Sequence, residues 1–252
     1  MGQVIVVANQ KGGVGKTTTA INLAACLAVA GHPCLLVDLD PQGNCTSGLG
    51  LVKNEVAPTT YDALVTQRPF SSVVRPTMVE NLDIAPANKD LVGAEIELVG
   101  EERREYRLRH ALDGAKDAYE YIFIDCPPSL GLLTVNGLVA ADSVLIALQC
   151  EYYALEGLSE LLHTVVLVRD RLNSSLRLQG VLLTMYQHTN LSRQVVADVR
   201  SHLGDKVYQT VIPRNVTISE APSFGRPVIL YDPACAGATA YAALAQEVAS
   251  RG

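Results

Sequence analysis

The sequence lacks several features that would assign it to common protein classes. No apolar stretch approaches the roughly 20 residues that span a lipid bilayer. The N-terminus, MGQVIVVANQKGG, has neither a basic region nor a long apolar segment, so a secretory signal peptide is not expected. Six cysteines are present without a CxxC pair, which argues against a zinc site and favours reduced, buried thiols. These absences indicate a cytoplasmic protein with no membrane partner.

Positive charge is also scarce, with 20 basic against 26 acidic side chains and a net charge of −6. This balance by itself argues against a nucleic-acid partner. The charge is uneven, however, because residues 166–226 hold eight basic and four acidic side chains, a net of +4 that leaves −10 for the rest. A focused basic patch can hold a polyanion on an acidic protein. Scattered charge on a solvated face remains the other interpretation.

Apolar segments of strand length alternate with helical patterns along the chain. Strands are predicted over residues 3–8, 34–39, 81–85, 121–125, 143–148, 179–184 and 207–212, with a loop over 40–50. Helices are predicted over residues 17–30, about 90–115, 132–140, 155–171, 191–203 and 236–250. Continuous apolar strands separated by helices indicate a sheet buried on both faces. Since no linker or repeat divides the chain, we expect residues 1–252 to form a single doubly wound α/β domain, a mainly parallel twisted sheet flanked by helices.

A glycine-rich segment follows the first predicted strand and opens the first predicted helix. Glycines let backbone N–H groups turn toward phosphate oxygens, and the start of the helix adds its positive dipole end. Lys16 would offset the charge of the β- and γ-phosphates, and the Thr17 hydroxyl would bind Mg²⁺. Gln10 stands where the general P-loop pattern has its first glycine. The residues of this segment expected to bind nucleotide are Lys11, Gly12, Gly13, Val14, Gly15, Lys16, Thr17 and Thr18.

Carboxylates end two other predicted strands. Asp38 and Asp40 stand at i and i+2 where the second strand ends, and Asp125 ends the apolar segment YIFID. Ligands bind at this edge in open α/β sheets. Asp125 is in the arrangement of a Walker B aspartate, which holds Mg²⁺ directly or through water. A strand-end cap is the alternative for each, and the neighbouring P-loop favours a role in the nucleotide site, which for Asp125 is to hold the metal.

Several longer segments resemble one known family. The pattern xKGGxxK[ST] is similar to the deviant Walker A motif of ParA, MinD and the nitrogenase iron protein. The segments NQKGGVGKTTTAINLAA, LLVDLDPQGN, IDCPPSLG, CEYYALEGL, GVLLTMY and VIPRNVTISEAPSFGRPVILYDP resemble the chromosomal Soj type, in the same order. The resemblance covers nearly the whole chain. It implies a P-loop ATPase that uses ATP and Mg²⁺.

The resemblance also implies roles for individual residues. Lys11 would reach across a dimer interface to the partner's nucleotide, while Lys16 would act on its own nucleotide. Asp40 would orient the attacking water. The adenine would lie against Met185, Pro213 and Asn215, and Glu151 would lie at the dimer face near the partner's ribose.

The implied activity is chromosome or plasmid partitioning by an ATP-dependent homodimer. The dimer would bind DNA non-specifically on the nucleoid, and a ParB-like protein would stimulate its slow hydrolysis. The chain departs from the family in two places associated with DNA binding: the segment after Met185 lacks the usual arginine, and Thr217 replaces a basic residue after PRNV. If DNA binds, we expect other basic residues to carry it, namely Arg193, Arg200, Lys206 and Arg214.

Other functions share the same nucleotide chemistry. A MinD-like positioning ATPase would need a bulky, basic amphipathic C-terminal helix, whereas this chain ends YAALAQEVASRG. An iron–sulfur protein would need a bridging cysteine pair, and a tyrosine kinase of this class would need a tyrosine-rich tail. A small-molecule ligase usually lacks the second lysine. A ParA-like ATPase that positions a protein cargo uses the same site residues, so the sequence scarcely distinguishes it from an ATPase that partitions chromosomes.

Overall fold

The computed structural model describes residues 2–151 and 154–251, and eight strands form one sheet within them. The strands are β1 (Gln3–Ala8), β2 (Cys34–Asp38), β3 (Arg75–Pro76), β4 (Leu82–Ala85), β5 (Tyr121–Asp125), β6 (Ser143–Gln149), β7 (Arg177–Tyr186) and β8 (Val207–Pro213). Their order is β3-β4-β2-β5-β1-β6-β7-β8. The β3–β4 pair is antiparallel, and the pairs from β4 to β8 are parallel. The predicted α/β fold with a mainly parallel sheet is confirmed.

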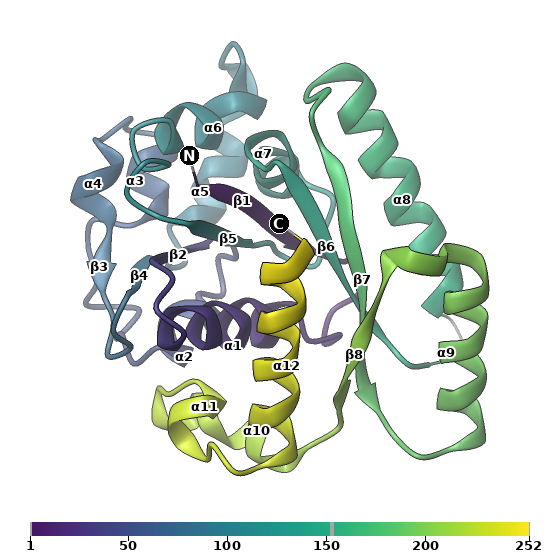
Figure 1. The fold of residues 1–252 in the computed structure, drawn as a ribbon. Coiled ribbons are helices and arrows are strands. Elements are labelled where there is room, and N and C mark those ends of the chain that lie inside the picture. The colour runs from purple at the N-terminus through teal and green to yellow at the C-terminus, as the bar shows by residue number, and fades with distance from the viewer. Residues whose placement is uncertain (1, 152–153, 252) are drawn as a thin grey trace.

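Helices cover both faces of the sheet (Figure 1). One layer contains α1 (Lys16–Val29), α2 (Asn44–Gly48), α10 (Val216–Glu220), α11 (Val228–Tyr231) and α12 (Ala236–Arg251). The other contains α3 (Thr60–Leu64), α4 (Phe70–Val73), α5 (Leu91–Glu97), α6 (Arg107–Leu112), α7 (Leu132–Ala140), α8 (Ala154–Arg171) and α9 (Asn190–Leu203). Along β1, Val4 and Val6 face the second layer, whereas Ile5 and Val7 face the first. This period of two explains why the strand is apolar throughout.

Two predicted segments differ from the structure. The helical pattern over 90–115 is divided into α5 and α6 by turns, with Arg103 in the left-handed region at φ 54°. The predicted loop over 40–50 contains the five-residue helix α2. Both departures involve helices of seven residues or fewer. Such short helices depend on tertiary packing, which a sequence period does not report.

The sheet topology gathers the carboxyl ends of β1, β2 and β5 at one edge. Strand β5 lies between β2 and β1, and Asp38 pairs directly with Asp125 across β2 and β5. Strand β1 ends at Ala8, three residues before the glycine-rich segment begins. The three motifs singled out in the sequence therefore meet at one edge of the sheet, where open α/β folds bind their ligands.

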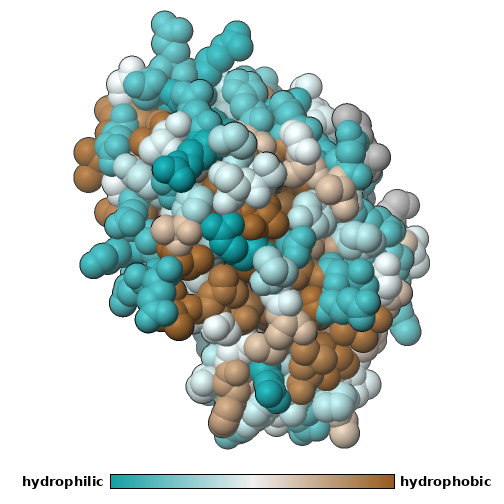
Figure 2. Space-filling model, turned by 90° about the vertical axis from the view of Figure 1, so that its left-hand side faces the viewer, coloured by the Kyte–Doolittle hydropathy of each residue, from teal (hydrophilic) through white to brown (hydrophobic). Residues whose placement is uncertain are grey.

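Apolar side chains also reach the surface on the face shown in Figure 2, where hydrophobic patches lie among hydrophilic side chains. Exposed large hydrophobic residues include Val52, Met78 and Phe224. Met78 and Gly225 both lie close to Gly50, so these segments adjoin one another. Single exposed apolar side chains are ordinary on protein surfaces and do not by themselves mark a binding site. Within the described residues, every helix is too short or too polar to cross a bilayer.

Candidate nucleotide-binding site

The glycine-rich segment forms a loop between β1 and α1. Gly13 and Gly15 have φ values of +73° and +91°, a backbone region that residues with a Cβ rarely adopt. Gly15 is the N-cap of α1, and Lys16 is its first residue. The loop therefore brings the positive end of a 14-residue helix to the edge of the sheet. This is the geometry that the phosphate cradle requires.

Side chains from distant strands fix the loop. Asn9 Nδ2 donates to the carbonyl of Ala147 at 2.6 Å, and Asn9 Oδ1 accepts from the N–H of Lys11 at 3.0 Å. On the other side, Thr184 Oγ1 donates to the carbonyl of Val14 at 2.8 Å. Neither Asn9 nor Thr184 was among the predicted site residues. Both lie inside motifs quoted for the family, which was the one available signal.

Lys16 lies inside the loop and is only 6% exposed. Its Nζ donates to the carbonyl of Lys11 at 3.0 Å, so the ammonium spans the loop. Burial lowers its pKa, while the nearby carboxylates of Asp125 and Asp40 act in the opposite direction. A cation that is removed from water in this way is suited to an anionic ligand.

Thr17 and Asp125 are in contact, as the predicted metal site requires. Thr17 Oγ1 donates to Asp125 Oδ2 at 2.7 Å, and Asp125 is fully buried. Its other oxygen, Oδ1, is also buried and has no hydrogen-bond partner within residues 2–151 and 154–251. Burial, and then the neighbouring charge of Asp38, raise the pKa of Asp125. A hydroxyl beside an under-bonded buried carboxylate fits Mg²⁺, which takes oxygen ligands and would supply the missing positive charge.

The two aspartates that end β2 have different surroundings. Asp38 is fully buried, and its Oδ2 accepts bonds from the N–H and the hydroxyl of Thr46 at 2.9 and 2.8 Å. Asp40 is 7% exposed, and its Oδ1 accepts from the N–H of Gln42 at 2.9 Å. Asp38 thus holds α2 against the sheet. Asp40 lies nearer the ligand side, close enough to influence Lys16.

The turn that carries these residues needs a glycine at one position. Gly43 has a φ of +59°, and a Cβ at this position would lie 2.7 Å from the carbonyl oxygen of Ala87. Any larger residue would therefore strain the backbone and push against the segment after β4. The short helix α2 begins directly after this turn. Gly43 consequently fixes where Asp40 and α2 stand relative to the loop.

The backbone of Lys11 belongs to the loop, whereas its side chain is exposed beside it. Its Nζ forms an ion pair with Glu151 Oε2 at 2.8 Å, and the two side chains are 54% and 49% exposed. The structure thus brings together two residues that were predicted for a dimer face, but it does so within one chain. The motif CEYYALEGL includes residues 152–153, which lie outside the described residues.

A pocket of about 270 Å³ adjoins the loop on the side of α1 and α12. Met185, Pro213 and Asn215, the residues predicted for adenine, all line it, together with Gly15 and Thr18. Met185 has a left-handed φ of 51°, and Asn215 Oδ1 accepts from the N–H of Ile218 to cap α10. The pocket contacts both the first turn of α1 and the ends of β7 and β8. Its position suits the base of a nucleotide whose phosphates lie in the loop.

The four predicted DNA-binding residues do not form one compact cluster. Lys206 precedes β8 and Arg214 follows it, so they stand at opposite ends of that strand. Arg214 donates its N–H to the carbonyl of Tyr186, four residues before α9, and Arg193 lies in the first turn of α9. Arg200 is half-buried and donates to the carbonyl of Gln209 at 3.1 Å. Arg193 and Arg214 are both exposed, and Arg214 lines the pocket beside the loop.

Comparisons with known proteins agree with this site. A family model described as an AAA domain matches residues 2–178. The sequence is 59% identical over 253 aligned residues to the sporulation initiation inhibitor protein Soj of Bacillus subtilis, with 100% of both chains covered. The chain belongs to the Soj/ParA family of ATPases. A further member, the chromosome partitioning protein ParA of Myxococcus xanthus, is 54% identical over 100% of this chain and 89% of its own length.

Solved structures extend the family comparison to bound ligands. A Mycobacterium smegmatis protein described as cobyrinic acid a,c-diamide synthase with bound ADP and magnesium is 38% identical, with a TM-score of 0.85 over 98% of this chain and 93% of that one. The cell division ATPase MinD of Pyrococcus furiosus is 25% identical, with a TM-score of 0.82 over 100% of both chains. As a Soj/ParA-type ATPase, the chain uses ATP and Mg²⁺. The loop, Lys16, Thr17 and Asp125 are the residues that would hold them.

Proposed function

We propose that this chain is a single-domain ATP-dependent dimerisation switch that binds DNA non-specifically and acts in chromosome partitioning. The observation that carries the proposal is the position of Lys11, which is exposed beside the loop, while Lys16 alone occupies the cradle. Relatives of 54–59% identity over the whole chain include proteins named for chromosome partitioning. Identity to the structure described as a diamide synthase is lower, at 38%.

ATP would join two chains through Lys11. In the single chain, this lysine pairs with Glu151 at the surface, where an ion pair contributes only about 0–1 kcal/mol. A partner's phosphates carry more negative charge than one carboxylate, so exchange of Glu151 for the partner's nucleotide is favourable once the chains meet. Two chains would thus enclose two nucleotides. Loss of the γ-phosphate would remove negative charge from the partner's nucleotide, so Lys11 would no longer favour it over Glu151.

Hydrolysis would depend on Asp40 and would be slow in the absence of a partner protein. Asp40 follows the end of β2 and is close enough to Lys16 to oppose the lowering of that lysine's pKa by burial, and a carboxylate there can orient a water molecule toward the γ-phosphate. A switch that signals by its lifetime gains nothing from rapid turnover. We expect a ParB-like protein to stimulate the step.

DNA would bind to the ATP dimer rather than to the monomer. Arg214 lines the pocket beside the loop, and Arg193 and Arg200 lie on α9, with Arg193 in its first turn. One chain offers few phosphate contacts, and non-specific affinity rises with the number of counterions released. When two chains pair, the basic surface of the second chain is held at a high effective concentration near the DNA that the first chain binds. This can strengthen binding by about 100-fold or more.

The test is fluorescence anisotropy with DNA duplexes of unrelated sequence, over a salt series, with ATP or ADP. We expect ATP-dependent binding that ignores sequence and weakens steeply with salt. Lys16→Ala should remove it because the cradle loses its cation. Arg193→Glu combined with Arg200→Glu should abolish DNA binding while the ATP dimer persists. Arg171→Glu combined with Arg177→Glu, a double change of equal charge at two exposed arginines outside the predicted four, is the matched control.

A protein cargo is the second candidate, because it uses the same nucleotide chemistry. The observation that favours it is the separation of Lys206 from Arg214, which leaves each chain with a small basic surface. An ATP dimer that forms normally but has no affinity for DNA at low salt would select this candidate. The nucleotide site would then stand, and the partitioning role would not.

A further inference from the structure

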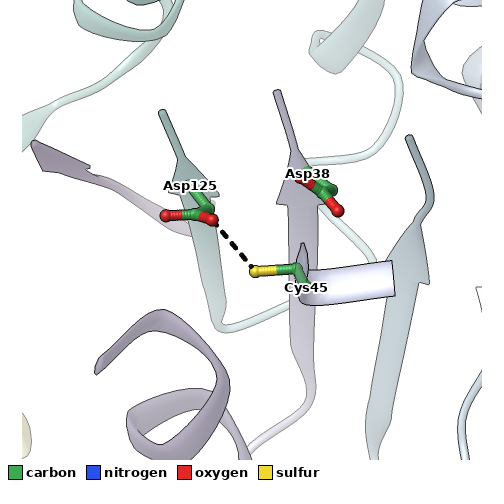
Figure 3. A group of neighbouring side chains, drawn as sticks. All are labelled: Asp38, Cys45 and Asp125. Carbon is green, nitrogen blue, oxygen red and sulfur yellow. Dashed lines mark hydrogen bonds between the residues drawn. The ribbon is translucent and has the colours of Figure 1, made fainter. Parts of the chain in front are cut away.

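Three buried side chains converge beside the proposed Mg²⁺ site: Asp38, Cys45 and Asp125 (Figure 3). The two aspartates are directly paired residues on β2 and β5, and Cys45 lies in the first turn of α2. Cys45 Sγ donates to Asp125 Oδ2 at 3.3 Å. One ligand atom from each residue lies within 4.8 Å of the other two.

The two carboxylates retain bonding capacity despite their burial. Asp125 Oδ1 has no hydrogen-bond partner in the described parts of the chain. Asp38 Oδ1 accepts one bond, from the N–H of Asp40 at 3.2 Å, which leaves one of its lone pairs free. A buried acceptor without a partner costs free energy, so the cluster favours a ligand that carries positive charge.

The thiol decides which cation fits. Mg²⁺ and Ca²⁺ take oxygen ligands, whereas Zn²⁺ and other thiophilic cations bind thiolate together with carboxylate. Zinc bonds of about 2.0–2.3 Å in a tetrahedron place neighbouring ligand atoms roughly 3.3–3.8 Å apart. The Cys45–Asp125 separation already has this size, and Asp38 needs a shift of about 1.5 Å at most to reach it.

We propose that Asp38, Cys45 and Asp125 form a site for a thiophilic divalent cation such as Zn²⁺, and that this cation competes with Mg²⁺ for Asp125. The proposal rests on the proposed function for the role of Asp125 toward Mg²⁺. On binding, the Cys45 thiol gives its proton to solvent and the thiolate becomes a ligand. The fourth position would be open to water. Occupied by Zn²⁺, Asp125 is no longer available to the nucleotide's metal.

The test uses Cd²⁺ as a spectroscopic probe, because a Cd²⁺–thiolate bond gives an ultraviolet charge-transfer band. The parent protein carries Cys235→Ser, which removes the one cysteine that is not buried, and is freed of metal and nucleotide. We expect the band to saturate at one Cd²⁺ per chain. Zn²⁺ should displace the probe, and excess Mg²⁺ should weaken its binding.

Variants of the cluster separate this site from other thiols. Cys45→Ser and Cys45→Ala should each lose the band, with a larger drop in Cd²⁺ affinity than the ~10–100-fold that loss of a supporting partner costs. Two variants are used so that one remains if the other fails to fold, as judged by circular dichroism. Cys126→Ser, a second buried cysteine next to Asp125 in sequence, should keep the band. A band that survives in the folded Cys45 variants overturns the proposal.

Calorimetry of Mg²⁺–ADP binding on the same samples keeps the two proposals apart. If the parent protein binds Mg²⁺–ADP but gives no Cd²⁺ band, the cation site is refuted and the proposed function stands. A Cys45-dependent band in a protein that binds no nucleotide gives the reverse result. Cys45 variants that lose the band and still bind Mg²⁺–ADP support both proposals.

Discussion

Two regions of the molecule hold buried or half-buried carboxylates in opposite ways. At the nucleotide edge, Asp125 and Asp38 face one another, and burial raises the pKa of each. At the edge strand β8, Glu247 of α12 accepts the N–H groups of Gln209 and Thr210 at 2.8 and 3.0 Å. Arg251 adds an ion pair at 2.7 Å. Asp125 Oδ1 has no partner within the described residues, whereas both oxygens of Glu247 are bonded.

The difference follows from what each carboxylate does. The pairing of β7 with β8 shifts register between Val181 and Leu183, and Glu247 binds the consecutive N–H groups of β8 in that stretch. Burial would raise the pKa of Glu247, but hydrogen bonds from Thr210 and Gln209 outweigh it and lower the pKa. Glu247 is therefore structural. Asp125 keeps an oxygen without a partner because its partner, in our proposal, is a metal ion that arrives with the nucleotide.

The largest effect is expected at the nucleotide edge, on turnover. Asp40→Ala should lower ATP hydrolysis at least ~100-fold, equivalent to about 2.7 kcal/mol in the barrier, because the attacking water loses its orienting carboxylate. ATP binding and dimerisation should persist, so the dimer should be trapped. Phosphate release and light scattering measure the two effects. Asp117→Ala, an exposed change of the same kind far from the loop, should leave both unchanged. Hydrolysis at the wild-type rate in Asp40→Ala would refute the assignment.

The next largest effect should be on stability and should come from Glu247, whose two oxygens are both hydrogen-bonded. Glu247→Gln should lower the free energy of unfolding at pH 7 by about 1–2 kcal/mol, since charge-assisted hydrogen bonds are the stronger kind. The pKa of Glu247 is lowered by folding, so its stabilisation is present above the unfolded value and disappears as pH falls through the folded value. The difference between wild type and variant should therefore shrink in acid.

Urea unfolding at several pH values measures this difference. Glu160→Gln on α8, an exposed glutamate, is the matched control and should change the free energy of unfolding by less than about 0.5 kcal/mol. A Glu247→Gln variant as stable as that control at pH 7 would show that the N–H groups of β8 do not need the carboxylate.

In the protein free of nucleotide and metal, Asp125→Asn should raise the free energy of unfolding, whereas Glu247→Gln lowers it. Folding raises the pKa of Asp125, so its stabilising contribution is complete below the unfolded pKa and is lost as pH rises through the folded one. The variant should consequently be more stable than wild type by about 1 kcal/mol at pH 8 and should lose this advantage toward pH 5. Mg²⁺–ADP should stabilise wild type far more than the variant. Thermal unfolding across this pH range checks the sign, and a variant less stable than wild type at pH 8 would contradict it.

Sequence patterns predicted the parts of this site that are local in the chain. The strand, the glycine turn and the helix from Gln3 to Val29 lie in one continuous segment, and their types and order were predicted correctly. Asp125 could be predicted because a carboxylate that ends an apolar strand, in a chain that also has a P-loop, is typical of a Mg²⁺ ligand. The edge at which these residues meet followed from the parallel sheet.

The remaining features depend on contacts between distant residues. The loop is fixed by Thr184, 170 residues away from Val14, and Asp38 is held by Thr46 rather than by the ligand. Glu247 binds N–H groups 37 and 38 residues earlier in the chain, and no local pattern marks it. Charge counting placed Lys206 and Arg214 in one basic stretch, although β8 separates them in space. Composition along a chain reports nearness in sequence, whereas a binding surface depends on nearness in the fold.

The smallest effect on the single chain is expected from Lys11→Ala. Its ion pair with Glu151 is about half exposed, so its loss should change the free energy of unfolding by at most about 0–1 kcal/mol. ATP binding by the monomer should stay nearly intact, because Lys16 and not Lys11 spans the loop. The ATP dimer should nevertheless weaken, because Lys11 is the residue proposed to reach the partner's phosphates.

Light scattering with ATP present, beside nucleotide binding under dilute conditions, separates these quantities. Lys89→Ala, which removes an exposed lysine elsewhere on the surface, should leave both unchanged. If Lys11→Ala dimerises as wild type does, the second lysine of the motif acts within its own chain, and the proposed switch loses its link between nucleotide and assembly. If the monomer instead loses ATP binding, Lys11 belongs to the cradle. A stable, ATP-binding chain that fails only to pair is the result that assigns Lys11 to the partner's nucleotide.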